Sequence, residues 1–327
     1  MNPKFIEVCA GAGGFSSGFL NTGFTCVLLN EKDKTCCKTL EKNHPNIPIS
    51  CSDMLELDLS PHKKIDVLLG GVPCQSFSQA GKRKGLDDSR GNLILVFAKM
   101  VKKYKPSVFI VENVKGLLTH NKGTTFSSIL ESFDKKNYNI EYKVLNAYNY
   151  GVAQKRERLF IVGTHKKRIT KKFEWPEPCL NKLVLKDVLL PEPEDKEGIN
   201  YSEEKAKVLA IVPPGGCWIN LPEDIQKQYM KKSFESGGGK RGIARRLSYN
   251  EPSLTLTTSP CQKQTERCHP KYTRPFTVRE YARIQSFPDD YEFCGTTNQK
   301  YKQIGNAVPV KLAERVAEQV LKLFTNF

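Results

Sequence analysis

A cysteine and a glutamate follow two neighbouring strands of the predicted sheet. The segment GGVPCQSFSQAG at 70–81 comes after an apolar run at 65–69, and it carries Cys74 directly after Pro73. A cysteine used for packing would lie inside the apolar run, whereas Cys74 lies in a polar loop bounded by glycines. Glu112 directly follows the next predicted strand, in VENV. Because α/β proteins bind ligands at the carboxyl ends of parallel strands, this thiol and this carboxyl group could approach one planar substrate from two sides.

The chemistry expected of such a pair is nucleophilic attack by the thiol. A free cysteine has a pKa of about 8.5, so only about 3 % of it is thiolate at pH 7. Catalysis by Cys74 would therefore require a lowered pKa or a nearby proton acceptor. The residue types alone leave other interpretations open, in which Cys74 is an inert loop cysteine and Glu112 is a surface acid or a helix cap.

A glycine-rich turn joins the first predicted strand to the first predicted helix, in FIEVCAGAGGF. Gly11, Gly13 and Gly14 permit a tight turn and a close approach of the backbone to a ligand, although the spacing is not that of the dinucleotide fingerprint GxGxxG. Glu31 ends the second strand and could bind the two hydroxyls of a ribose. Asp53 follows the third strand and could accept a hydrogen bond from an adenine amino group. These three strand ends predict a nucleoside-type ligand, while an ordinary βα turn would also explain the glycines.

Short apolar runs alternate with helical patterns in the first half of the chain. This alternation predicts an α/β fold with a largely parallel sheet that helices cover on both faces. The predicted strands are 5–10, 25–31, 47–51, 65–69, 107–111, 141–145 and 158–164, and the predicted helices are a stretch that ends near 22, then 33–43, 92–103 and 124–135.

The composition changes near Pro176. Residues 176–290 are rich in proline, glycine, lysine and polar residues, so we expect a smaller domain with little regular structure apart from a strand at 254–259. The tail at 308–324 has the pattern of an amphipathic helix. The predicted domains are a larger one at 1–185, completed by 292–327, and a smaller one at 186–291.

The charge of the chain is unevenly distributed. Of a formal net charge of +16, residues 227–274 contribute +8, from eleven Lys and Arg against three Asp and Glu. An evenly solvated, lysine-rich surface is the simplest alternative, but it would not concentrate half of the excess charge in one segment. The distribution therefore favours a polyanionic partner that binds this segment.

The cysteines predict neither a metal site nor a disulfide framework. The chain has eleven, and no two of them have CxxC spacing. The N-terminus lacks the pattern of a secretion signal, so we expect a reduced, cytoplasmic protein. No apolar run approaches the roughly 20 residues of a membrane span.

Together these motifs resemble those of the cytosine-C5 DNA methyltransferases, most closely the compact bacterial modification type. They occur in the family's order and extend over almost the whole chain. The motifs are FIEVCAGAGGF at 5–15, NE at 30–31, GGVPCQSFS at 70–78, DSRGNL at 88–93, VENV at 111–114, QKRERLF at 154–160, RPFTVREYARIQSFPDDY at 274–291 and YKQIGNAVPV at 301–310.

The resemblance implies a Rossmann-like, S-adenosylmethionine-dependent methyltransferase fold with a second, smaller, loop-rich target-recognition domain. It implies S-adenosyl-L-methionine as the methyl donor and a flipped-out cytosine in duplex DNA as the acceptor. In the family pattern the cysteine of PCQ is the nucleophile that adds to C6, while the glutamate of ENV and the second arginine of QKRERLF face the base. The catalytic residues implied are Cys74, Glu112, Arg158 and Arg156.

The resemblance also implies the residues that bind the cofactor and the DNA. The cofactor residues are Cys9, Ala10, Gly11, Gly13, Gly14, Phe15, Glu31, Asp53, Met54, Pro73, Leu93, Asn306 and Ala307. The chain departs from the family at Cys9, where an aromatic residue is usual, and at Lys32, so the expected stacking area for the cofactor is smaller. The expected DNA contacts are Gln75, Ser78, Arg90, Lys240, Arg241, Arg245, Arg246, Thr255, Gln262, Gln264 and Arg267.

The expected partner is double-stranded DNA, with a paired restriction endonuclease and no membrane. We expect a monomer in the cytoplasm, associated with the nucleoid in a prokaryote. Two alternatives remain open. One is an RNA cytosine-5 methyltransferase of the same fold that acts on transfer RNA, although the Cys-Phe-Thr signature of that branch is not found. The other is a non-catalytic DNA-binding relative, which would have no chemical reason to keep Cys74, Glu112 and Arg158.

Overall fold

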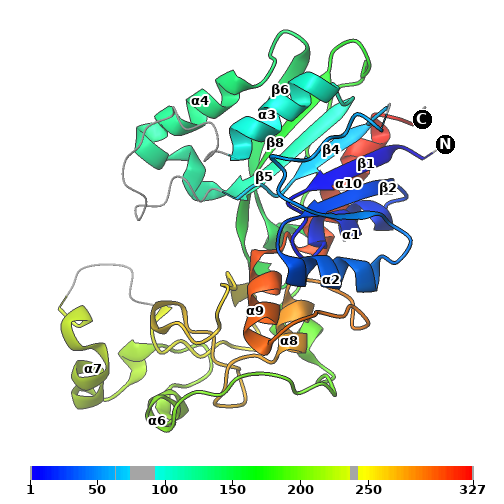
Figure 1. The fold of residues 1–327 in the computed structure, drawn as a ribbon. Coiled ribbons are helices and arrows are strands. Elements are labelled where there is room, and N and C mark those ends of the chain that lie inside the picture. The colour runs from blue at the N-terminus through cyan, green and yellow to red at the C-terminus, as the bar shows by residue number, and fades with distance from the viewer. Residues whose placement is uncertain (1, 63, 74–92, 236–241, 326–327) are drawn as a thin grey trace. The chain divides into compact units, whose positions relative to one another are not determined.

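A mixed β-sheet is the framework of the first half of the chain (Figure 1). The computed structural model describes residues 2–62, 64–73, 93–235 and 242–325. Within them the sheet has seven strands in the order β3-β2-β1-β4-β5-β8-β6, and β7 and β9 form a separate pair. The strands are β1 (Lys4–Val8), β2 (Thr25–Glu31), β3 (Ile49–Cys51), β4 (Val67–Gly70), β5 (Val108–Val114), β6 (Tyr138–Asn146), β7 (Gln154–Lys155), β8 (Glu157–His165) and β9 (Ser253–Leu254).

The α-helices of the described residues number ten. They are α1 (Gly14–Asn21), α2 (Lys34–Asn43), α3 (Leu93–Tyr104), α4 (Thr124–Ser132), α5 (Leu185–Leu189), α6 (Glu203–Ile211), α7 (Glu223–Met230), α8 (Val278–Ile284), α9 (Thr297–Asn306) and α10 (Val310–Lys322). None of these described helices is both long and apolar enough to cross a membrane.

The strand directions confirm the predicted α/β fold with a largely parallel sheet. The five strands from β3 to β5 in the sheet order are parallel, as predicted. By contrast, β8 is antiparallel to both β5 and β6. Only residues 147–156 connect β6 to β8, and a parallel pair requires a crossover of about a dozen residues or more. The short connection therefore makes these neighbouring strands antiparallel.

The first strand is shorter than the prediction of 5–10. It ends at Val8, because Cys9 adopts a left-handed backbone conformation with φ of 53°. Such a residue turns the chain out of the sheet, and Gly11 and Gly13 continue the turn with φ of 56° and 79°. The turn leads directly into α1, which begins at Gly14.

The two faces of the sheet carry different layers of helices, because successive side chains of a strand face opposite sides. Ile161 of β8 joins an apolar core with Phe97 of α3 and Ile129 of α4. The preceding residue, Phe160, instead contacts Phe15 of α1, with ring centroids 6.0 Å apart. Helices therefore cover both faces, as predicted (Figure 1).

The C-terminal helix completes this part of the molecule by packing against α1. A Cβ atom on Gly18 would lie 2.4 Å from the Cβ of Ala313, so only glycine permits this close approach. The predicted amphipathic tail is confirmed as α10, which buries Val316 and Val320 among other apolar residues. The two ends of the chain are thus fixed to each other.

The chain divides into two compact units whose boundaries differ from those of the predicted domains. The first unit contains Met1–Asn146, Glu157–Pro178 and Val308–Phe327, and the second contains Ala147–Arg156 and Cys179–Ala307. Residues 292–307, which we expected in the larger domain, therefore pack in the second unit. The same is true of the ten-residue connection between β6 and β8.

The second unit is more regular than its composition suggests, since it contains α5 to α9. Side chains at N-caps fix the starts of these short helices: Ser202 caps α6, Thr277 caps α8 and Thr296 caps α9. The strand predicted at 254–259 is limited to β9, which pairs with β7. Helices of this length have too few turns for their apolar periodicity to stand out in a polar segment.

Candidate active site

Glu112 and Arg158 form an ion pair on adjacent strands. Arg158 Nε lies 2.9 Å from Glu112 Oε1, and both side chains are largely buried. In the register of β5 with β8, Glu112 faces Phe160 and Val114 faces Arg158, so the pair is a diagonal one on the same face of the sheet. A second nitrogen, Arg158 Nη1, donates to the carbonyl of Glu157 at 2.8 Å. The structure thus brings together two predicted catalytic residues that lie far apart in sequence.

Asn113 connects this pair to the strand end that precedes Cys74. Its Nδ2 donates to the carbonyl of Val72 at 2.8 Å, and its side chain is buried. Neighbouring residues of a strand face opposite sides of the sheet, so the side chains of Glu112 and Asn113 contact groups on opposite faces of β5. Sequence reasoning missed Asn113, although its place beside Glu112 in VENV was the available signal.

The predicted site residues include six that the structure does not describe. Four of them, Cys74, Gln75, Ser78 and Arg90, lie outside the described residues, as do Lys240 and Arg241. The described chain reaches Pro73, which is exposed. The anchored carbonyl of Val72 lies two residues after the end of β4 and directly before Pro73.

Glu31 holds the glycine turn by its carboxylate. One oxygen, Oε2, accepts from the N–H of Gly11 at 2.7 Å. The other, Oε1, accepts from the N–H groups of Lys32 and Asp33, both at 2.8 Å. These bonds fix the acid next to the turn, as the nucleoside prediction requires. No described atom lies within 4 Å of where a Cβ of Gly11 would be, so there is open space beside the turn.

Asp53 forms an ion pair with a lysine, although we expected it to accept a hydrogen bond from an adenine amino group. Its Oδ2 lies 2.6 Å from Lys32 Nζ, and its Oδ1 accepts from the N–H of Leu55 at 3.1 Å. The hydrogen bond from Lys32 is the main reason why the pKa of Asp53 is lowered. Lys32 is one of the two departures from the family pattern, and it pairs with a carboxylate that we expected to contact the ligand.

The other departure, Cys9, packs against Met54. The Cys9 Sγ lies 3.4 Å from Met54 Sδ, and Met54 is buried. Burial, and then the nearby carboxylates of Glu31, Glu7 and Asp53, raises the pKa of the Cys9 thiol to about 12. The thiol is therefore neutral at physiological pH and serves as a small apolar group. Of the other predicted cofactor residues in this unit, Ala10 and Phe15 are buried and Leu93 is half-buried.

A buried acid that the sequence prediction did not include lies in the strand before the turn. Glu7 is 1 % exposed, and its Oε2 has no hydrogen-bond partner among the described residues. Burial raises the pKa of Glu7 to about 8, against the opposing effect of hydrogen bonds from Ser16. The negative charges of Glu31 and Glu112 raise it further. Glu7 therefore carries a proton in most of the molecules at neutral pH.

Arg156, predicted to be catalytic, has a different place in the structure. It is 0 % exposed and belongs to the second unit. Its guanidinium donates to the carbonyls of Leu256, Gly305 and Ala307 at 2.8–3.1 Å. Arg156 thus fixes the backbone on either side of Asn306, which is itself exposed. The catalytic interpretation of Arg156 is corrected to a positioning one, because a substrate could not reach a group buried among carbonyls.

Two of the arginines expected to contact DNA are also buried. Arg246 uses all five of its N–H groups, which donate to four carbonyls and to the hydroxyl of Thr273. Arg267 is 6 % exposed and donates to the carbonyls of Glu266 and Thr255. Contact with a base edge would require both side chains to leave these partners, so we withdraw them as DNA contacts.

The remaining expected DNA contacts of the second unit are accessible to different degrees. Gln262 and Gln264 are exposed. Arg245 is half-buried, with its Nη2 3.5 Å from a carboxylate oxygen of Glu251. Thr255 is half-buried, and its hydroxyl donates to the carbonyl of Lys155 at 2.8 Å. Exposure therefore favours the two glutamines as contacts for a ligand.

Comparisons with known proteins agree with the motifs. The sequence profile of the C-5 cytosine-specific DNA methylase family matches residues 3–322. The chain is 50 % identical to the Type II methyltransferase M.Eco47II of Escherichia coli, over 97 % of this chain and 78 % of that protein. It is 48 % identical to the Type II methyltransferase M.Sau96I of Staphylococcus aureus, over 98 % of this chain and 76 % of that protein.

Solved structures share the fold. A candidate DNA modification methyltransferase encoded in a prophage of E. coli superposes with a TM-score of 0.74 at 25 % identity, over 99 % of both chains. A DNMT2 variant of Spodoptera frugiperda superposes with a TM-score of 0.71 over 98 % of this chain and 99 % of that one. Its identity is 16 %, so this likeness concerns the fold alone.

Proposed function

Because the chain belongs to the C-5 cytosine-specific DNA methylase family and is a DNA cytosine-5 methyltransferase, we propose that Cys74, Glu112 and Arg158 are its catalytic residues. The observation that carries this proposal is the Glu112–Arg158 ion pair on β5 and β8. It lies at the carboxyl end of β5, beside the Val72 carbonyl that Asn113 holds. The proposed nucleophile follows this anchored backbone by two residues.

The chemistry explains why these residue types are required. C5 of cytosine is too weak a nucleophile to take a methyl group unaided. Addition of the Cys74 thiolate to C6 forms an S–C6 bond and moves electron density to C5. In its protonated form Glu112 donates a hydrogen bond to N3 and neutralises the negative charge that develops there, which is acid catalysis beside covalent catalysis. After the methyl group is attached, a water molecule takes the proton from C5 and the S–C6 bond breaks, which restores the thiolate and the aromatic ring.

Arg158 has a supporting role in this scheme. Its Nε holds Glu112 Oε1 at 2.9 Å and fixes the orientation of the carboxyl group. Within the described residues its Nη2 has no hydrogen-bond partner, so it can donate to the O2 atom of the base. The pair thus presents an acid and a donor side by side to one edge of cytosine.

The family and the fold imply S-adenosylmethionine as the cofactor, which supplies an electrophilic methyl group when bound. We assign its ribose hydroxyls to Glu31, whose carboxylate is already oriented by three N–H groups. The open space beside Gly11 suits close approach of the ligand to the backbone. Asp53 can accept from the adenine amino group only in competition with Lys32.

We assign DNA recognition to the second unit. Its exposed Gln262 and Gln264 have amide groups that can pair with base edges, and its lysines can neutralise phosphates. The target base must leave the duplex stack to reach a thiol and an acid together, at a cost of a few kcal/mol. The names of the relatives support a modification enzyme of a restriction–modification system. We propose that a paired endonuclease recognises the same site and that the methyltransferase is a monomer.

Covalent trapping tests the assignment of the nucleophile. In duplex DNA that carries 5-fluorocytosine, C5 cannot lose its substituent after methylation, so the S–C6 bond persists. We expect the parent protein to form a stable adduct and Cys74→Ala to form none. Cys51 is an exposed free cysteine, so Cys51→Ala is the matched control and should retain the adduct. A full yield in Cys74→Ala, mapped to another cysteine, would falsify the assignment.

A further inference from the structure

Three segments of the first unit, the end of α3 with the loop after it and two further loops, meet at one edge of the sheet. Val108 begins β5 opposite Thr164, and Tyr138 begins β6 opposite His165. The segments 102–107, 133–137 and 166–172 flank these residues and therefore lie at the same edge. Glu112 lies four residues further along β5, about 13 Å away at a rise of about 3.3 Å per residue. This edge is thus the one opposite the candidate active site.

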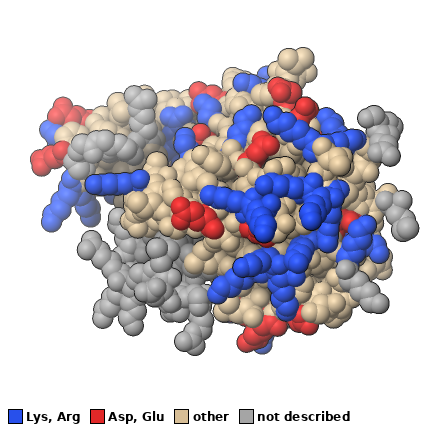
Figure 2. Space-filling view, turned by 90° about the horizontal axis from the view of Figure 1, so that it is seen from above, with Lys and Arg blue, Asp and Glu red and all other residues tan. Residues whose placement is uncertain are grey.

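These three segments carry a dense positive charge, and we call their surface the basic edge. They contain ten Lys and Arg against one acid, Asp134, a net charge of +9 out of the +16 of the chain. In the view from above, Figure 2 shows Lys and Arg side chains gathered together on one face. The ten are Lys102, Lys103, Lys105, Lys135, Lys136, Lys166, Lys167, Arg168, Lys171 and Lys172, and all except the half-buried Lys171 are exposed.

Hydrogen bonds between the loops fix the backbone of the basic edge. Lys166 N–H donates to the carbonyl of Asn137, and Lys166 Nζ to the carbonyl of Lys135, both at 2.9 Å. Arg168 donates to the carbonyl of Lys105, and the N–H of His165 donates to the carbonyl of Ser107 at 2.9 Å. The cations therefore form an array on a fixed base rather than three independent flexible tails.

Most of the cations have no acid to neutralise them. Lys103 pairs with Asp58 at 3.4 Å. Among the described residues, no ion pair is found for six of the others: Lys102, Lys105, Lys135, Lys136, Lys167 and Lys172. Crowding these charges without counterions is unfavourable, so the array suits a partner that brings its own negative charges.

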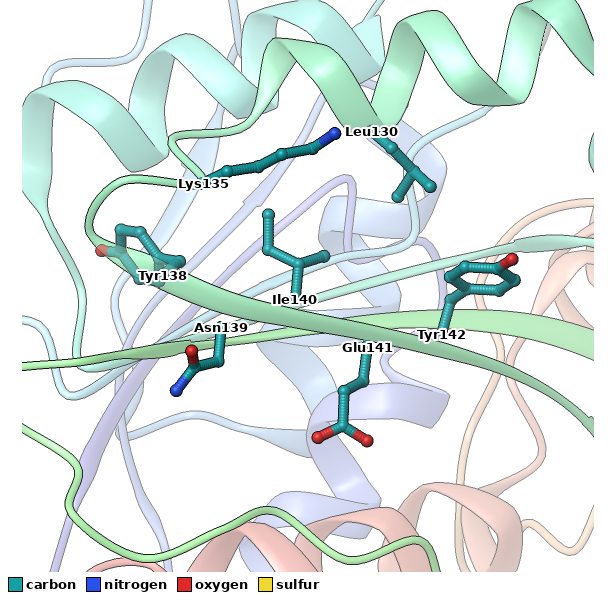
Figure 3. A pocket seen from close by; sticks show the side chains of 7 residues that line it. All are labelled: Leu130, Lys135, Tyr138, Asn139, Ile140, Glu141 and Tyr142. Carbon is teal, nitrogen blue, oxygen red and sulfur yellow. The ribbon is translucent and has the colours of Figure 1, made fainter.

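The shape of the surface favours an extended partner over a small anion. Lys135 lies beside an open hollow of about 430 Å³ between α4 and β6. Its side chain runs toward Leu130, above Ile140 (Figure 3). Lys171 and Lys172 line another hollow, of about 520 Å³, with the end of α10. The first hollow has Lys135 as its one cation, with Glu141 also in its lining, and the second places the carboxylate of Glu174 beside Lys171, Lys172 and Lys322, so neither has the all-cationic lining of a phosphate pocket. The charges instead follow the edge across three adjacent strands, which are about 4.8 Å apart.

We propose that the basic edge binds the phosphate backbone of duplex DNA independently of sequence, outside the target site. The proposal rests on duplex DNA as the substrate. Since the basic edge and the Glu112–Arg158 pair lie at opposite edges of the sheet, the bound segment is not the one that carries the target cytosine. It is a second segment of a long DNA, and its capture raises the local concentration of sites for the active site.

Neutralising the basic edge tests the proposal by binding, without need of catalysis. We expect Lys136→Gln/Lys167→Gln/Lys172→Gln to weaken binding to a site-free duplex of about 200 base pairs by about tenfold or more. The slope of log K against log salt should become less steep by about 0.9 for each phosphate that the variant no longer neutralises. The matched control is Lys34→Gln/Lys38→Gln/Lys42→Gln on α2, which removes the same charge from another exposed face and should change both quantities less than half as much.

Methylation on short and long DNA provides the second measurement. On a duplex of about 20 base pairs that carries the methylated sequence, the basic-edge variant should keep kcat/KM within about twofold of the parent. On kilobase DNA with the same sequence, kcat/KM should fall several-fold. Equal affinity, salt slope and long-DNA activity in the basic-edge and control variants would overturn the proposal, and would leave the surface to an acidic protein or to solvent. A loss of activity on the short duplex as well would also overturn it, because the surface would then act at the target site.

Discussion

Arg158 of the first unit and Arg246 of the second both belong to segments that the sequence singles out, yet their guanidinium groups meet different partners. Arg158 faces a carboxylate at the end of a strand and retains a nitrogen without a described partner. Arg246 is buried, and its five N–H groups are used by four carbonyls and one hydroxyl. We therefore propose that Arg158 contacts the substrate, whereas Arg246 stabilises the fold.

The difference follows from how each unit forms hydrogen bonds to its backbone N–H and carbonyl groups. In the sheet of the first unit, the carbonyls and N–H groups pair with neighbouring strands, so polar side chains at the strand ends remain available for chemistry. The second unit has few ladder hydrogen bonds, since its only described strands are β7 and β9 in a two-residue pair. Its buried carbonyls need other donors, and Arg156, Arg246 and Arg267 supply them. A basic residue in a loop-rich domain is therefore as easily structural as it is a DNA contact.

The largest expected effect is on the structural arginine. Arg246→Met leaves several buried carbonyls without a donor, so the free energy of unfolding should fall by about 3–5 kcal/mol. Chemical denaturation measures this directly. Its neighbour Arg245 is half-buried with one weak ion pair to Glu251, so Arg245→Met should cost less than about 1 kcal/mol. The structural role of Arg246 is wrong if Arg246→Met keeps the stability of the parent and instead lowers the discrimination between matched and mismatched DNA sites.

The catalytic pair should show the opposite behaviour. Glu112→Gln keeps the size of the side chain but removes the acid, so turnover should fall by about 10² or more while DNA affinity and thermal stability change little. Glu157→Gln is the control, because Glu157 is an exposed acid on the same strand as Arg158 and pairs with Lys115. It should stay within about twofold of the parent. Turnover of Glu112→Gln at the level of this control would show that Glu112 is not the acid that faces the base.

Glu7 extends the comparison to a buried acid of the first unit. Its Oε2 has no hydrogen-bond partner among the described residues. The folded protein holds this proton up to a pKa of about 8, whereas the unfolded chain loses it near the ordinary value of 4.5. Between these pH values the unfolded state binds fewer protons, so stability falls as pH rises, by at most about 1.4 kcal/mol per pH unit.

Urea unfolding of Glu7→Gln between about pH 5 and pH 8 checks this effect, because the amide does not titrate. We expect a flatter dependence of stability on pH than in the parent, and a relative gain that grows with pH. Glu41→Gln, at an exposed position of α2, should reproduce the slope of the parent. If Glu7→Gln has that same slope, Glu7 does not hold a proton in the folded protein.

The sequence by itself determined the local elements and the residue types of the site. Strand 25–31 is found with the predicted bounds, and helices 33–43 and 308–324 within a few residues of them. Apolar periodicity is a local property, and the first half of the chain has it in full. The motif order likewise sufficed for the family, since each motif is a short continuous segment and the cofactor and substrate chemistry follow from the family.

The tertiary structure alone decided which of these residues meet. Glu112 and Arg158 are brought together by the antiparallel register of β5 with β8, which follows from a short connection and not from either motif. The contact of Asn113 with Val72 depends on the neighbouring strand β4 in the same way. Burial among backbone carbonyls gives Arg156, Arg246 and Arg267 a structural role. Three segments that are separate in the sequence form the basic edge. Periodicity cannot encode such pairings, because they depend on how distant segments satisfy one another's polar groups once the chain has folded.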